Sequence, residues 1–151
     1  VLNRTGMGAI MTVKQISVFL ENQPGKLAEV AAVLSAQKIN LRAISVAEAS
    51  DFGIARIIVD DVFNAVTILK NENYICSITD VIAVEVQDEP GMLANMIAVL
   101  GTEGINIEYM YTILGKKNDV AYMIIRTNDD AQAAKILDAK GFRIVGMDAM
   151  K

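Results

Sequence analysis

The sequence predicts an α+β protein made of two tandem copies of one βαββαβ module, and two observations carry the prediction. The first is an internal repeat: a shift of 66 residues aligns residues 24–40 with residues 90–106 and gives 9 identities in 17 positions. Self-similarity of this kind marks a duplicated structural unit. The second is the periodicity of apolar residues, which changes between the strand and the helix period in the same order in each copy.

Each copy opens with a strand and a helix. The strand has apolar residues at every second position: Ile16, Val18 and Leu20, and Ile82, Val84 and Val86. The helix has apolar residues at positions i, i+3, i+4 and i+7, a spacing that predicts one face packed against the core. These residues are Leu27, Val30, Ala31 and Leu34 in copy one, and Leu93, Met96, Ile97 and Leu100 in copy two.

A strand pair, a second helix and a last strand follow in each copy. The paired strands are predicted at 41–49 with 53–60 and at 107–114 with 120–127, joined by turns at 50–53 and 115–119. The second helices contain Val62, Ala65, Val66 and Leu69, and Ala133, Ala134 and Leu137, and the last strands cover 74–78 and 142–147. The shift of 66 still pairs Ala55 with Ala121, and the alignment then slips by two residues.

This order predicts two ferredoxin-like modules, each an antiparallel sheet with both helices on one face. Strands such as 54–60 carry apolar residues at both parities, Ile54 and Ile58 on one face and Ile57 and Val59 on the other. A sheet that is apolar on both faces needs a second cover. We therefore expect the two modules to pair side by side through their strand edges and the open face to dock on a second chain, which predicts a homodimer.

Composition excludes several classes of function. The net charge is −4, from 14 basic and 18 acidic residues, so the basic surface that nucleic-acid binding requires is missing. The sequence has no histidine and one cysteine, Cys76, which predicts no metal site, no cofactor and no His-based catalysis. No apolar run reaches the length of a membrane span, and a lone cysteine favours the cytoplasm.

Two alternatives start from specific residues. Asp60 and Asp61 form a carboxylate pair, but adjacent residues at a strand end face different ways, and an acidic helix start explains them better than catalysis. Tyr109, Tyr111 and Tyr122 lie in the middle strands of copy two, without the basic surround that stacking on RNA requires. Neither an enzyme nor an RNA-binding module is favoured.

The motif that points to a ligand is the loop between the first strand and the first helix. It reads Asn-Gln-Pro-Gly-Lys-Leu at 22–27 and Asp-Glu-Pro-Gly-Met-Leu at 88–93. Proline near the first helical position fixes φ, and glycine allows close backbone approach. Unpaired N–H groups from Gly25 to Leu27, and from Gly91 to Leu93, would bind a carboxylate. Asn22 or Asp88 would accept hydrogen bonds from an ammonium group, so a free amino acid fits.

A structural explanation of the same residues stands beside this one. Asx-x-Pro-Gly is also an ordinary helix-start sequence. Asn40 and Asn106 close the connection from helix to strand, where asparagine suits a left-handed turn position. Each asparagine could instead offer its amide to the ligand.

The combination of the loop, the helix and the Ile-Asn pair that opens the second strand resembles the ACT domain, over nearly the whole of both copies. The resemblance implies ACT domains at 11–78 and 79–151 and ligand sites between two modules. Residues 1–10 precede the regular apolar pattern, and we expect them to be an added or frayed segment. Carried over by position, the site residues are Asn22, Gln23, Pro24, Gly25, Lys26, Leu27, Ile39 and Asn40, and Asp88, Glu89, Pro90, Gly91, Met92, Leu93, Ile105 and Asn106.

The first copy departs from the family's loop. It has Asn22 where the second copy keeps the usual aspartate, Asp88, which removes a charge opposite the ligand's ammonium and predicts different affinities at the two sites. Glu48 could contact a polar ligand side chain, although a solvated carboxylate is the simpler interpretation. The function implied is a non-catalytic sensor of a free L-amino acid. The alternative is a regulatory small subunit of an amino-acid biosynthetic enzyme, which acts mainly through protein contacts with this metabolic enzyme.

Overall fold

The computed structural model describes residues 11–114 and 119–151. These residues form two compact units, which we call the first unit (14–80) and the second unit (81–151 with the described residues before Lys14). The predicted N-terminal segment 1–10 and the predicted turn residues 115–118 lie outside the described residues.

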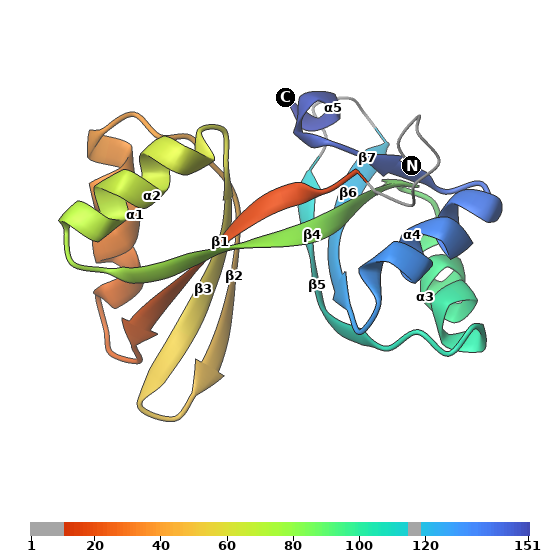
Figure 1. Cartoon of the computed structure of the whole chain (residues 1–151), viewed down its shortest axis with the longest axis horizontal. Helices are drawn as coiled ribbons and strands as arrows, with labels where there is room; N and C mark the ends of the chain where they lie inside the picture. The colour runs from red at the N-terminus through yellow and green to blue at the C-terminus, as the bar shows by residue number, and fades with distance from the viewer. Residues whose placement is uncertain (1–10, 115–118) are drawn as a thin grey trace. The chain divides into compact units, whose positions relative to one another are not determined.

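The elements follow the predicted order βαββαβ in each half of the chain (Figure 1). In the first half they are β1 (Val13–Glu21), α1 (Lys26–Ala36), β2 (Leu41–Ala49), β3 (Phe52–Val59), α2 (Val62–Asn71) and β4 (Ile75–Gln87). The second half uses the later part of β4 as its first strand. Its other elements are α3 (Met92–Thr102), β5 (Ile107–Leu114), β6 (Val120–Thr127), α4 (Asp130–Ala139), β7 (Arg143–Val145) and the additional helix α5 (Met147–Met150).

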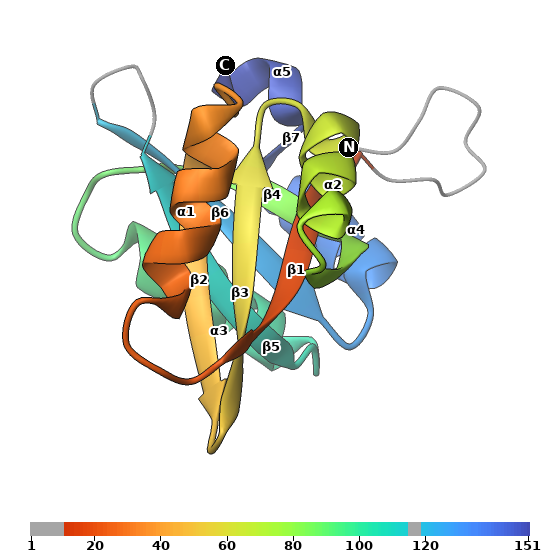
Figure 2. The ribbon, with the colours of Figure 1, turned by 90° about the vertical axis from the view of Figure 1, so that its left-hand side faces the viewer.

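The strands of the two units have the same spatial order. In the first unit the order is β4-β1-β3-β2, and β3 is antiparallel to both β1 and β2. In the second unit the order is β7-β4-β6-β5, with every neighbouring pair antiparallel. In the first unit α1 and α2 lie side by side over one face of the sheet (Figure 2). The ferredoxin-like arrangement predicted from the sequence is therefore confirmed for each unit.

Two predicted strands are one. Residues 74–78 and the strand at Ile82 were expected as separate elements, but β4 runs without a break over 13 residues. It thus serves as the last strand of the first unit and as the first strand of the second. No glycine or proline interrupts Thr79-Asp80-Val81, so no residue there forces the chain to turn.

The C-terminus also differs from the prediction. The strand expected at 142–147 is three residues long, and the chain then forms the short helix α5. The Tyr122 hydroxyl donates to the Ala149 carbonyl at 3.1 Å, and Met150 is buried. Tyr122 alternates with Met123, which packs in the helix-side core. The helix α5 therefore lies on the sheet face opposite α3 and α4.

The two-residue slip in the repeat falls between the paired strands, which corrects the predicted match of Ala55 with Ala121. Ile16 pairs with Ile57, and the equivalent Ile82 pairs with Ile125. The shift on β3 and β6 is thus 68 residues, and Ala55 corresponds to Met123. Because two extra residues in a hairpin turn leave the side-chain alternation of both strands intact, the sheet tolerates them.

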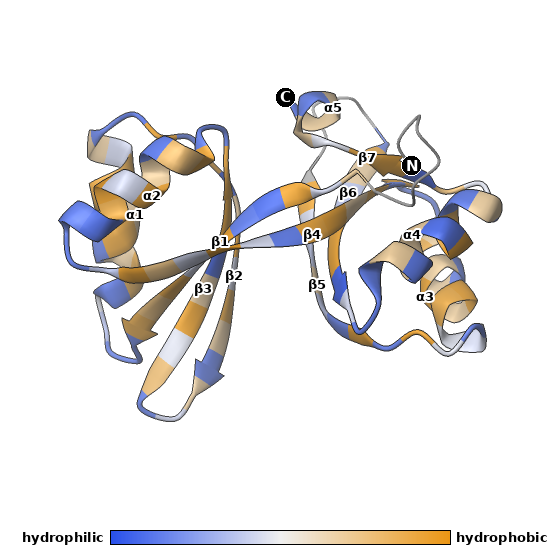
Figure 3. Ribbon diagram, in the orientation of Figure 1, coloured by the Kyte–Doolittle hydropathy of each residue, from blue (hydrophilic) through white to orange (hydrophobic). Residues whose placement is uncertain are grey.

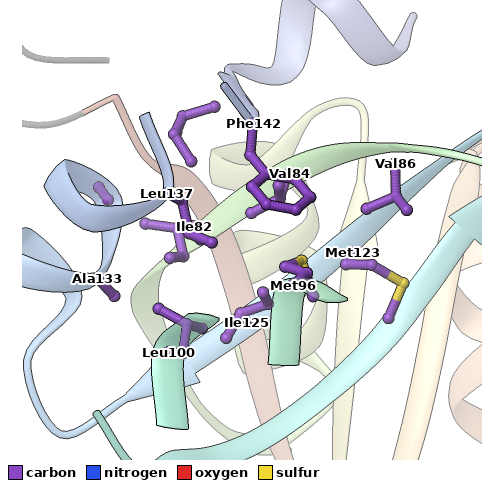
Figure 4. Close-up of a cluster of buried hydrophobic side chains, with 12 residues drawn as sticks. Ile82, Val84, Val86, Met96, Leu100, Met123, Ile125, Ala133, Leu137 and Phe142 are labelled. Carbon is purple, nitrogen blue, oxygen red and sulfur yellow. The ribbon is translucent and has the colours of Figure 1, made fainter. Parts of the chain in front are cut away.

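Each unit has its own hydrophobic core between sheet and helices. Figure 3 shows apolar segments on the strands and on the helices of each unit. The first core contains Ile16, Val18, Val30, Leu34, Ile39, Ala55, Ile57, Val59, Ala65 and Leu69. The second, drawn in Figure 4, contains Ile82, Val84, Val86, Met96, Leu100, Met123, Ile125, Ala133, Ala134, Leu137, Phe142 and Ile144.

The predicted helix stripes are only partly core. Val30 and Leu34 in α1, like Met96 and Leu100 in α3, are buried, but Leu27, Leu93 and Ile97 remain 38%, 41% and 40% exposed. The leucines in the first turn, Leu27 and Leu93, are exposed because each helix begins next to the end of the sheet, where fewer strand residues cover their side chains. In the first unit this exposed leucine contributes to the wall of a cleft.

Candidate functional site

The entrance loops, residues 22–27 and 88–93, have nearly the same backbone geometry. Gly25 and Gly91 both have φ 87°, with ψ −13° and −12°. The N–H of Lys26 donates to the carbonyl of Gln23 at 3.3 Å, and that of Met92 to Glu89 at 3.2 Å. These are type II β-turns with proline at the second position and glycine at the third. The sequence suggested a proline near the first helical position. In the structure each proline lies two residues before the helix begins.

One of the backbone N–H groups that was expected to bind a ligand instead donates a hydrogen bond within the turn. The N–H groups of Lys26 and Met92 are satisfied within the loop. No side chain caps α1 or α3, and among the described residues the N–H groups of Gly25 and Leu27 have no acceptor. Free N–H groups at the positive end of a helix favour an anion such as a carboxylate. The predicted open helix start is therefore present in both copies, with one fewer free amide than expected.

A cleft of about 200 Å³ lies beside the first entrance loop. We call it the entrance cleft. Register explains its strand side: Glu48 and Leu20 both pair with Gly53, and Val46 pairs with Ala55, which is a core residue. All of these residues therefore face the helix side of the sheet. The lining residues are Leu20, Glu21, Asn22, Gln23, Lys26, Leu27, Val46, Glu48 and Gly53.

Apolar and polar residues of the entrance cleft are arranged on different elements. Leu27 is 38% exposed and Val46 54% exposed, so both present apolar surface to the cleft. Gly53 widens the cleft because it has no side chain on this face. A Cβ there would come 3.1 Å from the carbonyl oxygen of Ala47. The cleft therefore offers an apolar wall, free amides at the start of α1, and polar groups on β2 and the loop.

The polar side of the entrance cleft is a small hydrogen-bond network. Asn22 Nδ2 donates to Glu48 Oε2 at 3.3 Å and to the Ser50 carbonyl at 2.9 Å. The Asn22 backbone N–H donates to the Asp51 carbonyl at 2.9 Å. These bonds tie the loop to the β2–β3 hairpin. Glu48, for which the sequence favoured the simple interpretation of a solvated carboxylate, therefore lines the cleft and accepts a hydrogen bond from the loop.

The second entrance loop is anchored in the same way. The Asp88 N–H donates to the Asp119 carbonyl at 2.8 Å, which matches the bond from Asn22 to Asp51. Asp88 and Glu89 are exposed. Among the described residues the Asp88 carboxylate has no hydrogen-bond or ion-pair partner.

The structure does not bring the remaining predicted site residues to the entrance loop of their own unit. Ile39 is 8% exposed and belongs to the first core, and Ile105 packs against the second. Asn40 Nδ2 donates to Asp60 Oδ2 at 3.1 Å, at the end of the sheet far from Asn22. The Asn106 N–H donates to Asn128 Oδ1 at 2.9 Å.

The left-handed turn expected at Asn40 and Asn106 occurs two residues earlier in each copy. Lys38 has φ 59° and Gly104 has φ 76°, whereas Asn40 and Asn106 have negative φ. The chain reverses immediately after the helix end, which places the left-handed residue there. The asparagines instead hold the start of the following strand through their hydrogen bonds.

The acidic pair Asp60-Asp61 has structural roles. Asp61 Oδ1 accepts from the N–H of Asn64 and caps α2, while Asp60 accepts from Asn40 and from Arg42. Cys76 is half-buried against the first core, and burial raises the pKa of its thiol. Within residues 11–114 and 119–151, no group of three or more Cys, Asp or Glu side chains is placed to hold a metal ion.

Comparison with known families decides what this arrangement belongs to. Residues 11–149 match the family described as the ACT domain pair. The chain belongs to this family. Its crystal-structure relatives include protein BT0572 from Bacteroides thetaiotaomicron, which is 38% identical over 93% of this chain and 96% of that one, with a TM-score of 0.84.

Other members of the fold are more distant in sequence. The regulatory subunit of aspartate kinase from Thermus thermophilus is 18% identical over 87% of this ACT domain pair and 94% of that chain, with a TM-score of 0.63. The comparison with curated proteins gives no significant match. None of the described helices of the ACT domain pair is long and apolar enough to cross a membrane.

Proposed function

We propose that this ACT domain pair is a non-catalytic regulatory protein that binds a free L-amino acid at its entrance loops. The observation that carries the proposal is the entrance cleft. It combines free N–H groups at the start of α1, a hydrogen-bond acceptor and a carboxylate on the loop and β2, and an apolar wall from Leu27 and Val46. These groups match the carboxylate, the ammonium and the side chain of an amino acid, respectively.

Regulation follows from linkage. A ligand shifts a conformational or assembly equilibrium only by the difference between its affinities for the two states. The entrance loop is tied to the β2–β3 hairpin by Asn22, so an amino acid in the cleft would favour the arrangement of loop and hairpin that holds it. A partner protein that recognises this arrangement would then respond to the amino acid.

The test is a thermal-shift screen of the purified chain against the twenty L-amino acids. A ligand present at 100 times its dissociation constant adds about 2.7 kcal/mol to the stability of the native state, which corresponds to a rise in Tm of roughly 5–10 °C for a chain of this size. The D-enantiomer and the decarboxylated amine of each active amino acid serve as controls. A native, cooperatively melting protein that responds to none of the twenty would refute the proposal.

A second role, as a regulatory subunit of a metabolic enzyme, is favoured by apolar surface on the open face of the first unit. Phe19 and Phe52 are each 47% exposed, with ring centroids 6.1 Å apart, and Ile75 is 73% exposed. Each alternates along its strand with core-facing residues. Exposed apolar side chains that lie together, as Phe19 and Phe52 do, mark interaction surfaces. Co-purification of the untagged chain from native extract, followed by mass spectrometry, tests this role: a stoichiometric enzyme partner supports it, and isolation of the chain alone contradicts it.

A further inference from the structure

Glu48 places a carboxylate in the entrance cleft, whereas the first entrance loop, residues 22–27, has no acidic residue. Glu48 lies on β2, faces the helix side of the sheet and lines the cleft. Asn22 uses its Nδ2 group to donate to Glu48 and to Ser50. Among the described residues no donor reaches its Oδ1 atom, which is therefore available as an acceptor, and the carboxylate of Glu48 has further lone pairs to offer.

The second copy has different residue types at the two equivalent positions. Asp88 takes the loop position of Asn22, and Leu114 takes the strand position of Glu48. Register establishes the second equivalence: Glu48 and Leu20 pair with Gly53, and Leu114 and Val86 pair with Ala121. Across this pair of positions, each copy therefore has one carboxylate, on the strand in the first and on the loop in the second.

In the first copy the negative charge therefore comes from Glu48 on β2 and not from the loop position of Asn22. A carboxylate whose partner carries a positive charge forms a stronger hydrogen bond than a neutral acceptor does. Lys26 is the basic residue among those that line the cleft. Its Nζ lies 3.8 Å from Glu29 Oε2, so its ion pair is with Glu29 and not with Glu48. A cationic group placed between Asn22 Oδ1 and Glu48 would be held by one neutral and one charged acceptor.

We propose that Glu48 is the anionic partner of the ligand's ammonium group in the first cleft. The inference rests on the proposed function and deepens it, because it states how the first copy recognises an amine although its loop has Asn22 in place of an aspartate. It makes Glu48 a specificity-determining residue of the first site.

The experiment is an NMR titration of the isotope-labelled full chain with each of the twenty L-amino acids. The backbone amide signals of Gly25 and Gly91 report on the first and the second entrance loop separately. E48Q removes the charge and keeps the size of the side chain. We expect it to weaken binding at Gly25 about tenfold, the loss of one charge-assisted hydrogen bond, and to leave binding at Gly91 unchanged. D88N should give the opposite pattern.

Two further variants separate a direct contact from a general effect of charge. N22D/E48L copies the second site into the first and should restore binding at Gly25 to within about threefold of wild type. D51N removes a side-chain charge from the adjacent hairpin at a residue that does not line the cleft, and it keeps the Asp51 backbone carbonyl that accepts from the Asn22 N–H. Binding measured at Gly25 and at Gly91 should therefore be unchanged.

The possible failures are distinguishable. If no amino acid shifts either glycine in the wild-type protein, both the proposed function and this inference are overturned. If amino acids shift Gly25 equally in wild type and E48Q, amino-acid binding stands and the role of Glu48 is refuted. An equal loss in D51N and E48Q would also refute it, because the effect would then be one of net charge. Since Glu48 is exposed, E48Q keeps the fold and carries the test even if the double variant does not fold.

Discussion

The geometry of the entrance loops makes a quantitative prediction about Gly25→Ala and Gly91→Ala. Both glycines have φ 87°, where a residue with a Cβ is disfavoured by about 1–2 kcal/mol. Nothing lies within 4 Å of a Cβ built at either position, so no steric clash adds to this cost. Alanine also reduces the conformational freedom of the unfolded chain, which stabilises the folded state by about 0.4–1 kcal/mol. Each variant should therefore lose roughly 1 kcal/mol of stability.

Gly101 provides a matched control with the opposite sign. It lies in the last turn of α3, has negative φ, and a Cβ there also meets nothing within 4 Å. Gly101→Ala should gain up to about 0.5 kcal/mol, the lower end of the value for a helix interior, because alanine is the better helix former. The three variants thus make the same chemical change in equally open surroundings and differ in backbone φ.

Urea unfolding followed by circular dichroism measures all three variants, with equal m-values as the condition for comparison. The expected order of stability is Gly101→Ala above wild type, and Gly25→Ala and Gly91→Ala below it. If Gly25→Ala were as stable as wild type, the type II turn would not require a left-handed residue at this position. The account of how the loop exposes its amides would then be wrong.

Three other perturbations follow from the structure. Leu100→Ala removes a fully buried side chain from the second core and should cost about 2–5 kcal/mol in chemical denaturation; a loss below 1 kcal/mol would show that the site is poorly packed. Asp61→Ala removes the cap on the Asn64 N–H and should cost about 1 kcal/mol, whereas Asp61→Asn should retain most of it. Burial raises the pKa of Cys76, an effect that Lys70 partly opposes. Cys76 should therefore react with Ellman's reagent at pH 8 more slowly than glutathione does, with the rate still rising at higher pH; a rate equal to that of glutathione would contradict this. Because the folded-state pKa lies above the unfolded one, the stability linked to Cys76 is present below the unfolded pKa and is lost as the pH rises through the folded value.

Local sequence patterns were sufficient for most of the fold. The repeat, the order of elements and the bounds of β2, β5 and β6 follow from periodicity and turn residues, which act over a few neighbouring positions. The open, glycine-containing helix starts were also predicted, because a Pro-Gly pair restricts the backbone by itself. Both features need no information from distant parts of the chain.

The sequence by itself determined that the protein is a duplicated βαββαβ unit with an unusual loop before the first helix of each copy. Only the tertiary structure decided that Glu48 faces the cleft beside Asn22, 26 residues away, that Leu27 lines it, and that one strand serves both units. These features depend on register across the sheet and on where each helix begins relative to the strand ends. Both are fixed by packing between segments that are far apart in the chain, and local patterns contain no direct record of them.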